Sequence, residues 1–180
     1  RRLWFLDRLF PETSSYNMPG AVRFRGALNV AVFDAALTFL QNRHESLRTE
    51  IIAREGEPFQ QILAQTQPPL RFVDVSGLPS PLRAAELRRA TEAELHRSFR
   101  LARGPLLRTL LFRVRPDEHV FLFNMHHIVS DGWSMGVLVR ELTATYDALR
   151  SAKSVALPPL PIQYADYAVW QREQLSGEAT

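Results

Sequence analysis

The chain has 180 residues, of which 46% are hydrophobic and 23% are charged, a composition typical of one globular domain with a sizeable core. It contains no cysteine, which excludes disulfide bonds, thiolate metal sites and a cysteine nucleophile. The formal net charge is only +3, and the arginines are scattered among acidic residues, so we expect no nucleic-acid partner.

The two ends of the sequence predict a piece of a longer protein. Arg1 and Arg2 lead directly into an apolar segment without an initiator methionine, and no signal peptide opens the chain. The last residues, 176–180, have the composition of a linker or a cut end. No apolar run reaches the roughly 18 residues that a membrane span needs, so we expect none.

Residue periodicity predicts mixed helices and strands in the first half of the chain. Asn29 belongs to a residue type that caps helices, and apolar residues follow it at helical spacing. This apolar face consists of Phe33, Ala36, Leu37 and Leu40. The predicted elements are a helix over 1–10, a turn-rich loop over 11–19, a strand over 21–25, a helix over 29–43, and the two strands of a hairpin over 47–53 and 59–63.

The second half of the sequence contains the residues predicted to form the centre of the fold. Two nearly continuous apolar segments, 106–114 and 119–125, are typical of strands covered on both sides. A charged helix over 80–101 precedes them, with its buried positions expected at Leu82, Leu87, Leu95 and Phe99. The other predicted elements are a strand over 70–75, a helix over 133–150 with Trp133 inward, a proline-rich connector over 157–161, and a short helix over 163–174. This order predicts an α/β sandwich in which helices cover a mixed sheet.

The segment M-H-H-I-V-S-D-G-W-S, residues 125–134, is the strongest candidate for a functional site. Adjacent strand residues point to opposite faces, so only one of His126 and His127 faces a cleft. Imidazole titrates near neutrality and serves as a general base or stabilises a developing charge, a role we assign to His127. Asp131 would orient an imidazole or pair with an arginine, and Gly132 would allow a close backbone approach or a positive φ. Ser134 and the first turn of the next helix offer N–H donors near the same spot.

Simpler interpretations of this segment stay open. It is also compatible with an ordinary turn between a strand and a helix. A metal site is disfavoured, because the adjacent histidines diverge and no H-E-x-x-H spacing occurs. A serine nucleophile has no G-x-S-x-G elbow to support it.

A second cluster, R-H-E-S-L-R-T at residues 43–49, contains two candidate partners for Asp131. If Asp131 is buried it needs a cation, and either Arg43 or Arg48 would serve; the alternative is a solvated helix end. Several aromatic side chains are expected to pack in the core or against another lobe rather than line a substrate path. They are Trp4, Phe5, Tyr16, Trp133 and Trp170.

Taken together, these segments resemble the condensation domains of nonribosomal peptide synthetases. M-H-H-I-V-S-D-G-W-S is similar to the core H-H-x-x-x-D-G motif of that family. R-L-W-F-L (2–6), R-H-E-S-L-R-T (43–49) and Y-A-D-Y-A-V-W-Q-R (164–172) are similar to its first, second and fourth motifs. Four motifs in family order span nearly the whole chain, which makes the resemblance specific.

The resemblance implies a chloramphenicol-acetyltransferase-like fold of two lobes with a tunnel between them. It implies peptide-bond formation between a donor thioester and an acceptor amine, each carried on the phosphopantetheine arm of a carrier protein, with no cofactor bound directly. It also implies adenylation domains as neighbours and a cytoplasmic location. His127 would be the active-site histidine, Gly132 the close-approach residue, and Asp131 a structural residue paired with Arg43, whereas His126 would be scaffold. The ending D-G-W-S, with Trp133 and Ser134, resembles the subtype that accepts an L-configured donor.

The chain is only about half as long as the domains it resembles. We therefore expect residues 1–175 to be the N-terminal lobe alone, with the C-terminal lobe absent and the fragment weak or inactive by itself. Two other functions stay open. One is an acyltransferase of the same superfamily that uses a coenzyme A donor, and the other is a non-catalytic module that recruits another protein.

Overall fold

The structure is a computed structural model of the chain, and it describes residues 1–64 and 70–177. Helices and strands are mixed along the sequence, as predicted. In chain order they are α1 (Arg2–Leu9), β1 (Asn17–Arg25), α2 (Val30–Arg43), the 3₁₀ helix η1 (Glu45–Arg48), β2 (Thr49–Arg54), β3 (Glu57–Ile62), β4 (Arg71–Asp74), α3 (Ser80–His96), the 3₁₀ helix η2 (Leu101–Arg103), β5 (Leu107–Arg115), β6 (Glu118–His126), α4 (Gly132–Arg150) and α5 (Tyr164–Gly177).

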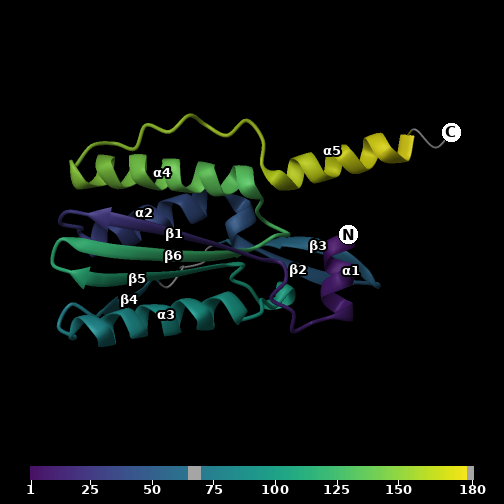
Figure 1. Ribbon diagram of the computed structural model, residues 1–180. Helices are drawn as coiled ribbons and strands as arrows, with labels where there is room; N and C mark the ends of the chain where they lie inside the picture. Colours follow the sequence, from purple (N-terminus) through teal and green to yellow (C-terminus); the bar gives the residue numbers. More distant parts are fainter. Residues whose placement is uncertain (65–69, 178–180) are drawn as a thin grey trace.

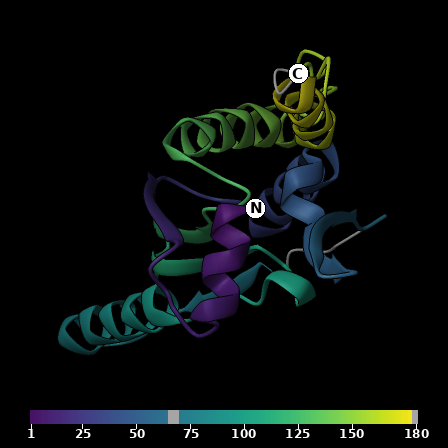
Figure 2. The ribbon, with the colours of Figure 1, turned by 90° about the vertical axis from the view of Figure 1, so that its right-hand side faces the viewer.

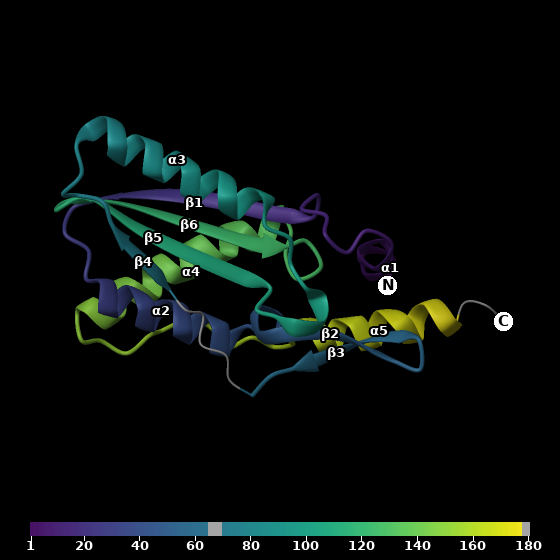
Figure 3. The ribbon, with the colours of Figure 1, turned by 90° about the horizontal axis from the view of Figure 1, so that it is seen from below.

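A four-stranded mixed sheet forms the centre, with the strand order β1-β6-β5-β4. Only β4 and β5 are parallel; the other neighbours are antiparallel. Helices α2 and α4 cover one face of this sheet and α3 covers the other (Figures 1 and 3). Strands β2 and β3 form a separate hairpin. The prediction of a mixed sheet covered by helices is confirmed.

The core has one layer on each face of the sheet. The layer under α2 and α4 is the larger, and it includes the whole predicted apolar face of α2. The cap is also as predicted, because the Asn29 side chain accepts a hydrogen bond from the Val32 N–H. The layer under α3 is built mainly from strand residues, namely Val75, Leu110, Phe112, Val114, Val120 and Leu122. Strands β5 and β6 are buried on both faces, as their apolar character predicts.

Strand β1 begins four residues earlier than predicted, within the expected loop. Asn17 pairs with His126, and the strand includes Pro19. A proline lacks the N–H that a ladder needs, but β1 lies at the edge of the sheet, where this is tolerated. Gly20 is required by close packing, since a Cβ there would lie 2.3 Å from Cζ of Phe123.

Helix α3 is shorter than predicted and contributes less to the core. It ends at His96, and the chain continues through an extended segment into η2. Leu82 is 58% exposed, contrary to prediction, whereas Phe99 is buried beyond the end of the helix. The cause is a short apolar stripe on a helix that carries six Arg and Glu residues, so only part of its length packs against the sheet.

One end of the molecule carries exposed aromatic side chains. Figure 1 and Figure 2 place α1, the β2–β3 hairpin and α5 at the end of the sheet where β6 stops. Trp133 is 82% exposed, and Phe5 and Trp170 are exposed as well, so none of the three belongs to a core of this chain. Helix α5 continues through Gly177, so two residues of the predicted linker are helical; residues 178–180 lie outside the described part. Over residues 1–64 and 70–177, no helix has the length and apolar character that a membrane crossing requires.

Candidate functional site

The histidine pair lies where the central strand β6 gives way to α4. The strand ends at His126, residues 127–129 form a turn, and Asp131 is the N-cap of α4. Asp131 and Ser134 form a capping box, in which the Ser134 N–H donates to Asp131 (2.8 Å) and the Asp131 N–H donates to Oγ of Ser134 (2.7 Å). The turn is therefore fixed at one end by the sheet and at the other by a capped helix.

His126 is the buried member of the pair. It is 3% exposed, and its ring lies 6.0 Å, between centroids, from both the Tyr16 and the Phe99 rings. Its Nδ1 accepts a hydrogen bond from the Ile128 N–H (3.0 Å), and its carbonyl accepts from the Val129 N–H and from the Ser130 hydroxyl. His126 thus holds the backbone of the turn from within.

Burial, together with the positive charge that His127 can carry, lowers the pKa of His126 to about 4. Because the folded pKa lies below the ordinary 6.5, the unfolded chain binds more protons between these values, and acid destabilises the fold there. We expect the free energy of unfolding to fall by about 3 kcal/mol from this group as the pH drops from 6.5 to 4. Urea unfolding at both pH values, in the wild type and in His126→Phe, measures this difference. The titration of carboxylates contributes equally to the pH dependence of both proteins and cancels in the comparison. Equal pH dependence in the two proteins would contradict the lowered pKa of His126.

His127 is the exposed member of the pair. Its backbone N–H donates to the Tyr16 carbonyl (2.8 Å), which ties the turn to the segment that precedes β1. The prediction that the two side chains diverge is confirmed. The result is an imidazole presented to the outside from a backbone held on both sides.

Asp131 is exposed, and its partners differ from those predicted. Hydrogen bonds from the Ser134 hydroxyl and the Ser134 N–H lower the pKa of Asp131, with smaller contributions from the Trp133 N–H and from His127. The Ser134 N–H, one of the donors expected to face the site, is therefore occupied by the cap. None of the ion pairs in the described residues joins Asp131 to Arg43 or to Arg48, so that prediction is wrong. An exposed carboxylate that is satisfied by a helix N-terminus needs no buried cation.

Arg43 instead pairs with Glu141, a buried residue of α4. Nε of Arg43 lies 3.1 Å from Oε2 of Glu141, and Nε2 of His44 lies 2.8 Å from the same oxygen. Arg43 also donates to the Pro158 carbonyl, and the Gln163 side chain bridges the Arg43 carbonyl and the Glu45 N–H. This cluster joins the end of α2 to α4 and to the connector that leads into α5.

Arg48 has a local role. It donates to the Leu63 carbonyl and lies 3.4 Å from Glu45, one turn back in η1. These contacts tie η1 to the end of β3.

Gly132 and Trp133 open α4 beside His127. A Cβ built on Gly132 would meet no described atom within 4 Å, and its φ is not among the positive ones. The chain itself therefore gives no steric reason for glycine, and of the two roles expected for Gly132 the positive φ is wrong. Among the described residues, no group of His, Asp and Glu side chains is arranged to hold a metal ion.

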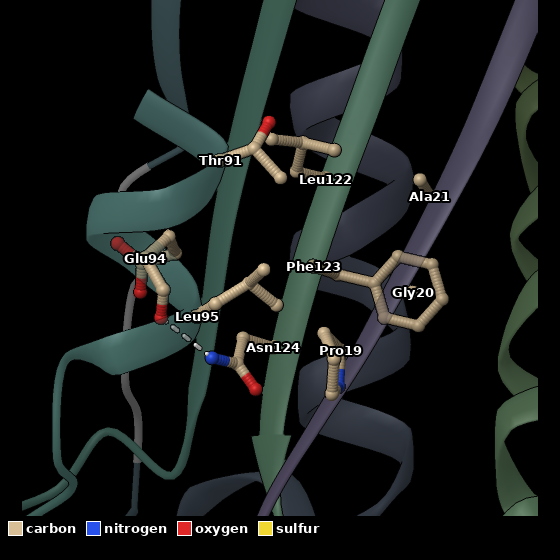
Figure 4. A pocket seen from close by; sticks show the side chains of 9 residues that line it. All are labelled: Pro19, Gly20, Ala21, Thr91, Glu94, Leu95, Leu122, Phe123 and Asn124. Atoms are coloured by element: carbon tan, nitrogen blue, oxygen red, sulfur yellow. Dashed lines mark hydrogen bonds between the residues drawn. The ribbon is translucent and has the colours of Figure 1, made fainter. Parts of the chain in front are cut away.

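A cavity lies elsewhere, between β1, β6 and α3. It has a volume of about 170 Å³, and its lining includes Pro19, Leu95 and Asn124 (Figure 4). Figure 4 shows Asn124 turned toward α3, where its Nδ2 donates to the Glu94 carbonyl (2.9 Å). No residue of the 127–131 turn lines this cavity.

Comparison with known proteins decides the family. The sequence model of the condensation domain family matches residues 1–180 of this chain. The chain belongs to the condensation domain family.

Relatives of this condensation-domain chain include peptide synthetases. It is 46% identical over 178 residues to one of the linear gramicidin synthase proteins of Brevibacillus parabrevis, covering 99% of this chain and 3% of the relative. It is 45% identical to phosphinothricin tripeptide synthetase PhsC of Streptomyces viridochromogenes, covering 97% of this chain and 16% of that protein. The chain therefore spans only a small part of these relatives.

Solved structures confirm the chloramphenicol-acetyltransferase-like fold. The first condensation domain of the calcium-dependent antibiotic synthetase, in complex with a substrate analogue, matches with a TM-score of 0.86 and 25% identity, over 99% of this chain and 44% of that one. The complex of the X-domain and OxyB from teicoplanin biosynthesis matches with a TM-score of 0.82 and 35% identity, over 98% of this chain and 37% of that one.

Sequence reasoning missed Glu141 as the anchor of the second motif in this condensation-domain chain. A signal was present, because Glu141 lies three residues after Leu138 and directly before Leu142, on the buried stripe of α4. A carboxylate inside an apolar stripe predicts a buried cation partner. The candidate cations lie in the R-H-E motif.

Proposed function

We propose that residues 1–175 form the N-terminal lobe of a condensation domain that joins a carrier-bound donor acyl group to the amine of a carrier-bound acceptor. The observation that carries the proposal is the exposed His127 at the end of the central strand. It stands on a turn held by the buried His126 and by the capped start of α4.

The reaction exchanges a thioester for an amide. The acceptor amine attacks the thioester carbonyl, a C–N bond forms, the C–S bond breaks, and the proton lost by the amine passes to the departing thiolate. The imidazole of His127 either takes that proton as a general base or orients the amine by a hydrogen bond, and both roles need direct contact. His126, buried with its Nδ1 engaged, is unable to serve.

The proposal extends to the partners and the location. We propose that the substrates reach the site on phosphopantetheine arms of carrier protein domains, with adenylation domains as neighbours and a cytoplasmic location. The ending with Trp133 and Ser134 favours an L-configured donor. The C-terminal lobe is proposed to cover the exposed apolar side chains at the end where β6 stops, including Phe5, Trp133 and Trp170.

The variant Gly132→Ala distinguishes an effect on substrate contact from an effect on folding. A methyl group there meets no described atom, and alanine is the better helix former, so stability is expected to stay constant or rise by up to about 1 kcal/mol. Turnover of the complete domain is expected to fall about tenfold or more, because the methyl group occupies space that the reacting groups need. Thermal unfolding and steady-state kinetics on the same preparation measure both effects. Unchanged turnover would remove Gly132 from the reaction centre.

The proposal is tested by loading one carrier protein with a donor aminoacyl group and another with an acceptor, and by following both by intact-protein mass spectrometry. The complete condensation domain is expected to move the donor onto the acceptor amine and leave a free thiol on the donor carrier. Amide formation from a coenzyme A donor alone would favour the related acyltransferase. The 180-residue chain by itself is expected to show little or no transfer, because half of the tunnel wall is proposed to come from the second lobe.

A recruiting module is the second candidate, because one similar structure is a complex of the X-domain with another protein, OxyB. His127, Asp131 and Gly132 are all present in this chain, which favours the enzyme. A complete domain that is folded but transfers nothing would favour the module.

A further inference from the structure

The C-terminal end of α3 is held by side chains from three strands of the sheet. A helix leaves its last four carbonyls without partners inside the helix. Asn124 of β6 donates to the Glu94 carbonyl, and Asn17 of β1 donates to the carbonyls of Leu95 (2.7 Å) and Arg97 (3.0 Å). Arg108 of β5 completes the set. The strands that surround the candidate site therefore also fix where α3 ends.

Arg108 makes as many carbonyl contacts as Asn17 and adds an ion pair. Its guanidinium donates to the carbonyls of Arg97 (2.6 Å) and Ser98 (3.1 Å), and its Nε pairs with the Glu94 carboxylate. The side chain is 12% exposed, and burial lowers the pKa of Arg108 while Glu94 opposes this shift. The guanidinium carbon also lies 3.6 Å from the centroid of the Phe99 ring. A planar cation stacked on an aromatic face fixes the plane of that ring.

Phe99, whose ring Arg108 holds in place, contacts the histidine pair. Its ring meets the His126 ring edge to face, at 84° between planes. Phe99 is 3% exposed and forms a third, smaller core cluster with Ile51, Leu101 and Leu106. Ile128 and Val129 of the turn pack against this cluster. The His126 ring, held between Phe99 and Tyr16, accepts the Ile128 N–H. A continuous series of contacts therefore runs from Glu94 through Arg108, Phe99 and His126 to the backbone that carries His127.

We propose that Arg108 is a positioning residue for the reaction at His127: it seats Phe99 against His126 and so sets the turn, without touching substrate. The inference rests on the proposed function of His127. It goes further in assigning a role to a residue of the neighbouring strand. A purely structural Arg108 would change stability and leave the rate per folded molecule unchanged.

The test uses Arg108→Lys in the complete condensation domain. Lysine keeps a cation for Glu94, but it loses the stacking face and the forked donors. We expect kcat to fall about tenfold, with KM for the acceptor carrier unchanged, because the turn is displaced and not the carrier surface. We also expect the ring nitrogen resonances of His126 to move in the NMR spectrum. Phe99→Leu, which leaves the Arg108–Glu94 pair in place, is expected to lower kcat equally, and it decides the matter if Arg108→Lys does not fold.

Two controls separate position from stability. Arg113, on the same strand, also pairs with an acid (Asp74, 3.0 Å) and lies over an aromatic ring (Phe72, 5.2 Å). It lies at the end of β5 that is remote from His126. Arg113→Lys is therefore expected to leave kcat and the His126 resonances unchanged. Val114→Ala lowers stability through the core under α3 and is expected to leave the rate per folded molecule unchanged. An unchanged kcat in Arg108→Lys and Phe99→Leu, or an equal loss in Val114→Ala, would overturn the positioning role. If His127→Ala also keeps full turnover, the proposed function itself fails, and the two failures are thereby distinguished.

Discussion

Replacing His127 with alanine in the complete condensation domain is expected to lower amide formation by about two to four orders of magnitude, the range lost when a positioned acid–base group is removed. The fold is expected to survive, because the His127 side chain is exposed and only its backbone N–H is used, in the bond to Tyr16. Single-turnover transfer between loaded carriers measures the rate, and circular dichroism with thermal unfolding measures the fold.

His126→Asn is the matched control at the neighbouring position. The asparagine side-chain oxygen supplies an acceptor for the Ile128 N–H, but the ring contacts with Tyr16 and Phe99 are lost. We expect this variant to lose more stability than His127→Ala and less of its rate per folded molecule. If His127→Ala retained most of the wild-type rate, the assignment of the reacting histidine would be wrong.

Replacing Glu141 with alanine is expected to cost about 3 kcal/mol of stability, because it leaves the partly buried Arg43 without its anion. Glu141 is 9% exposed and faces both Arg43 and His44. Burial alone would raise the pKa of Glu141, but the hydrogen bonds and charges of His44 and Arg43 outweigh burial and lower it. The contribution of Glu141 to stability is therefore full above the ordinary pKa of 4.5 and is lost as the pH falls through the lowered value. Urea unfolding at pH 7 and at successively lower pH measures both effects.

Glu86 on α3 provides the comparison. It also pairs with an arginine, Arg89, but at an exposed position three residues away on the same helix. Glu86→Ala is expected to cost far less stability than Glu141→Ala, because solvent screens this pair. Equal losses in the two variants would show that the Arg43–Glu141 cluster is no more than a surface ion pair.

The sequence predicts the parts of this fold that local pattern determines. The apolar spacing of α2, the Asn29 cap and the continuous apolar strands β5 and β6 all form as expected, because burial of one stripe or both faces leaves few alternatives. The divergence of His126 and His127 follows from the two-residue period of a strand. These features depend on neighbours in sequence.

Features that depend on tertiary partners are predicted less well. The sequence suggests an arginine partner for Asp131, but local hydrogen bonds from Ser134 satisfy it, and Arg43 goes to a carboxylate 98 residues away. The early start of β1 depends on pairing of Asn17 with His126, which local propensity at Pro19 and Gly20 opposes. The partners of charged residues and the ends of strands depend on residues that are distant in sequence but close in space. A single sequence does not show which residues these are.

The most direct test of the role of His127 is a crystal structure of the complete condensation domain with a phosphopantetheine-linked acceptor analogue. We predict that the amine, or the group that replaces it, lies within about 3.2 Å of a ring nitrogen of His127, close to Gly132, with no analogue atom in contact with the His126 ring. An analogue bound in the tunnel with its amine well beyond hydrogen-bonding reach of His127 would contradict the central role given to this histidine.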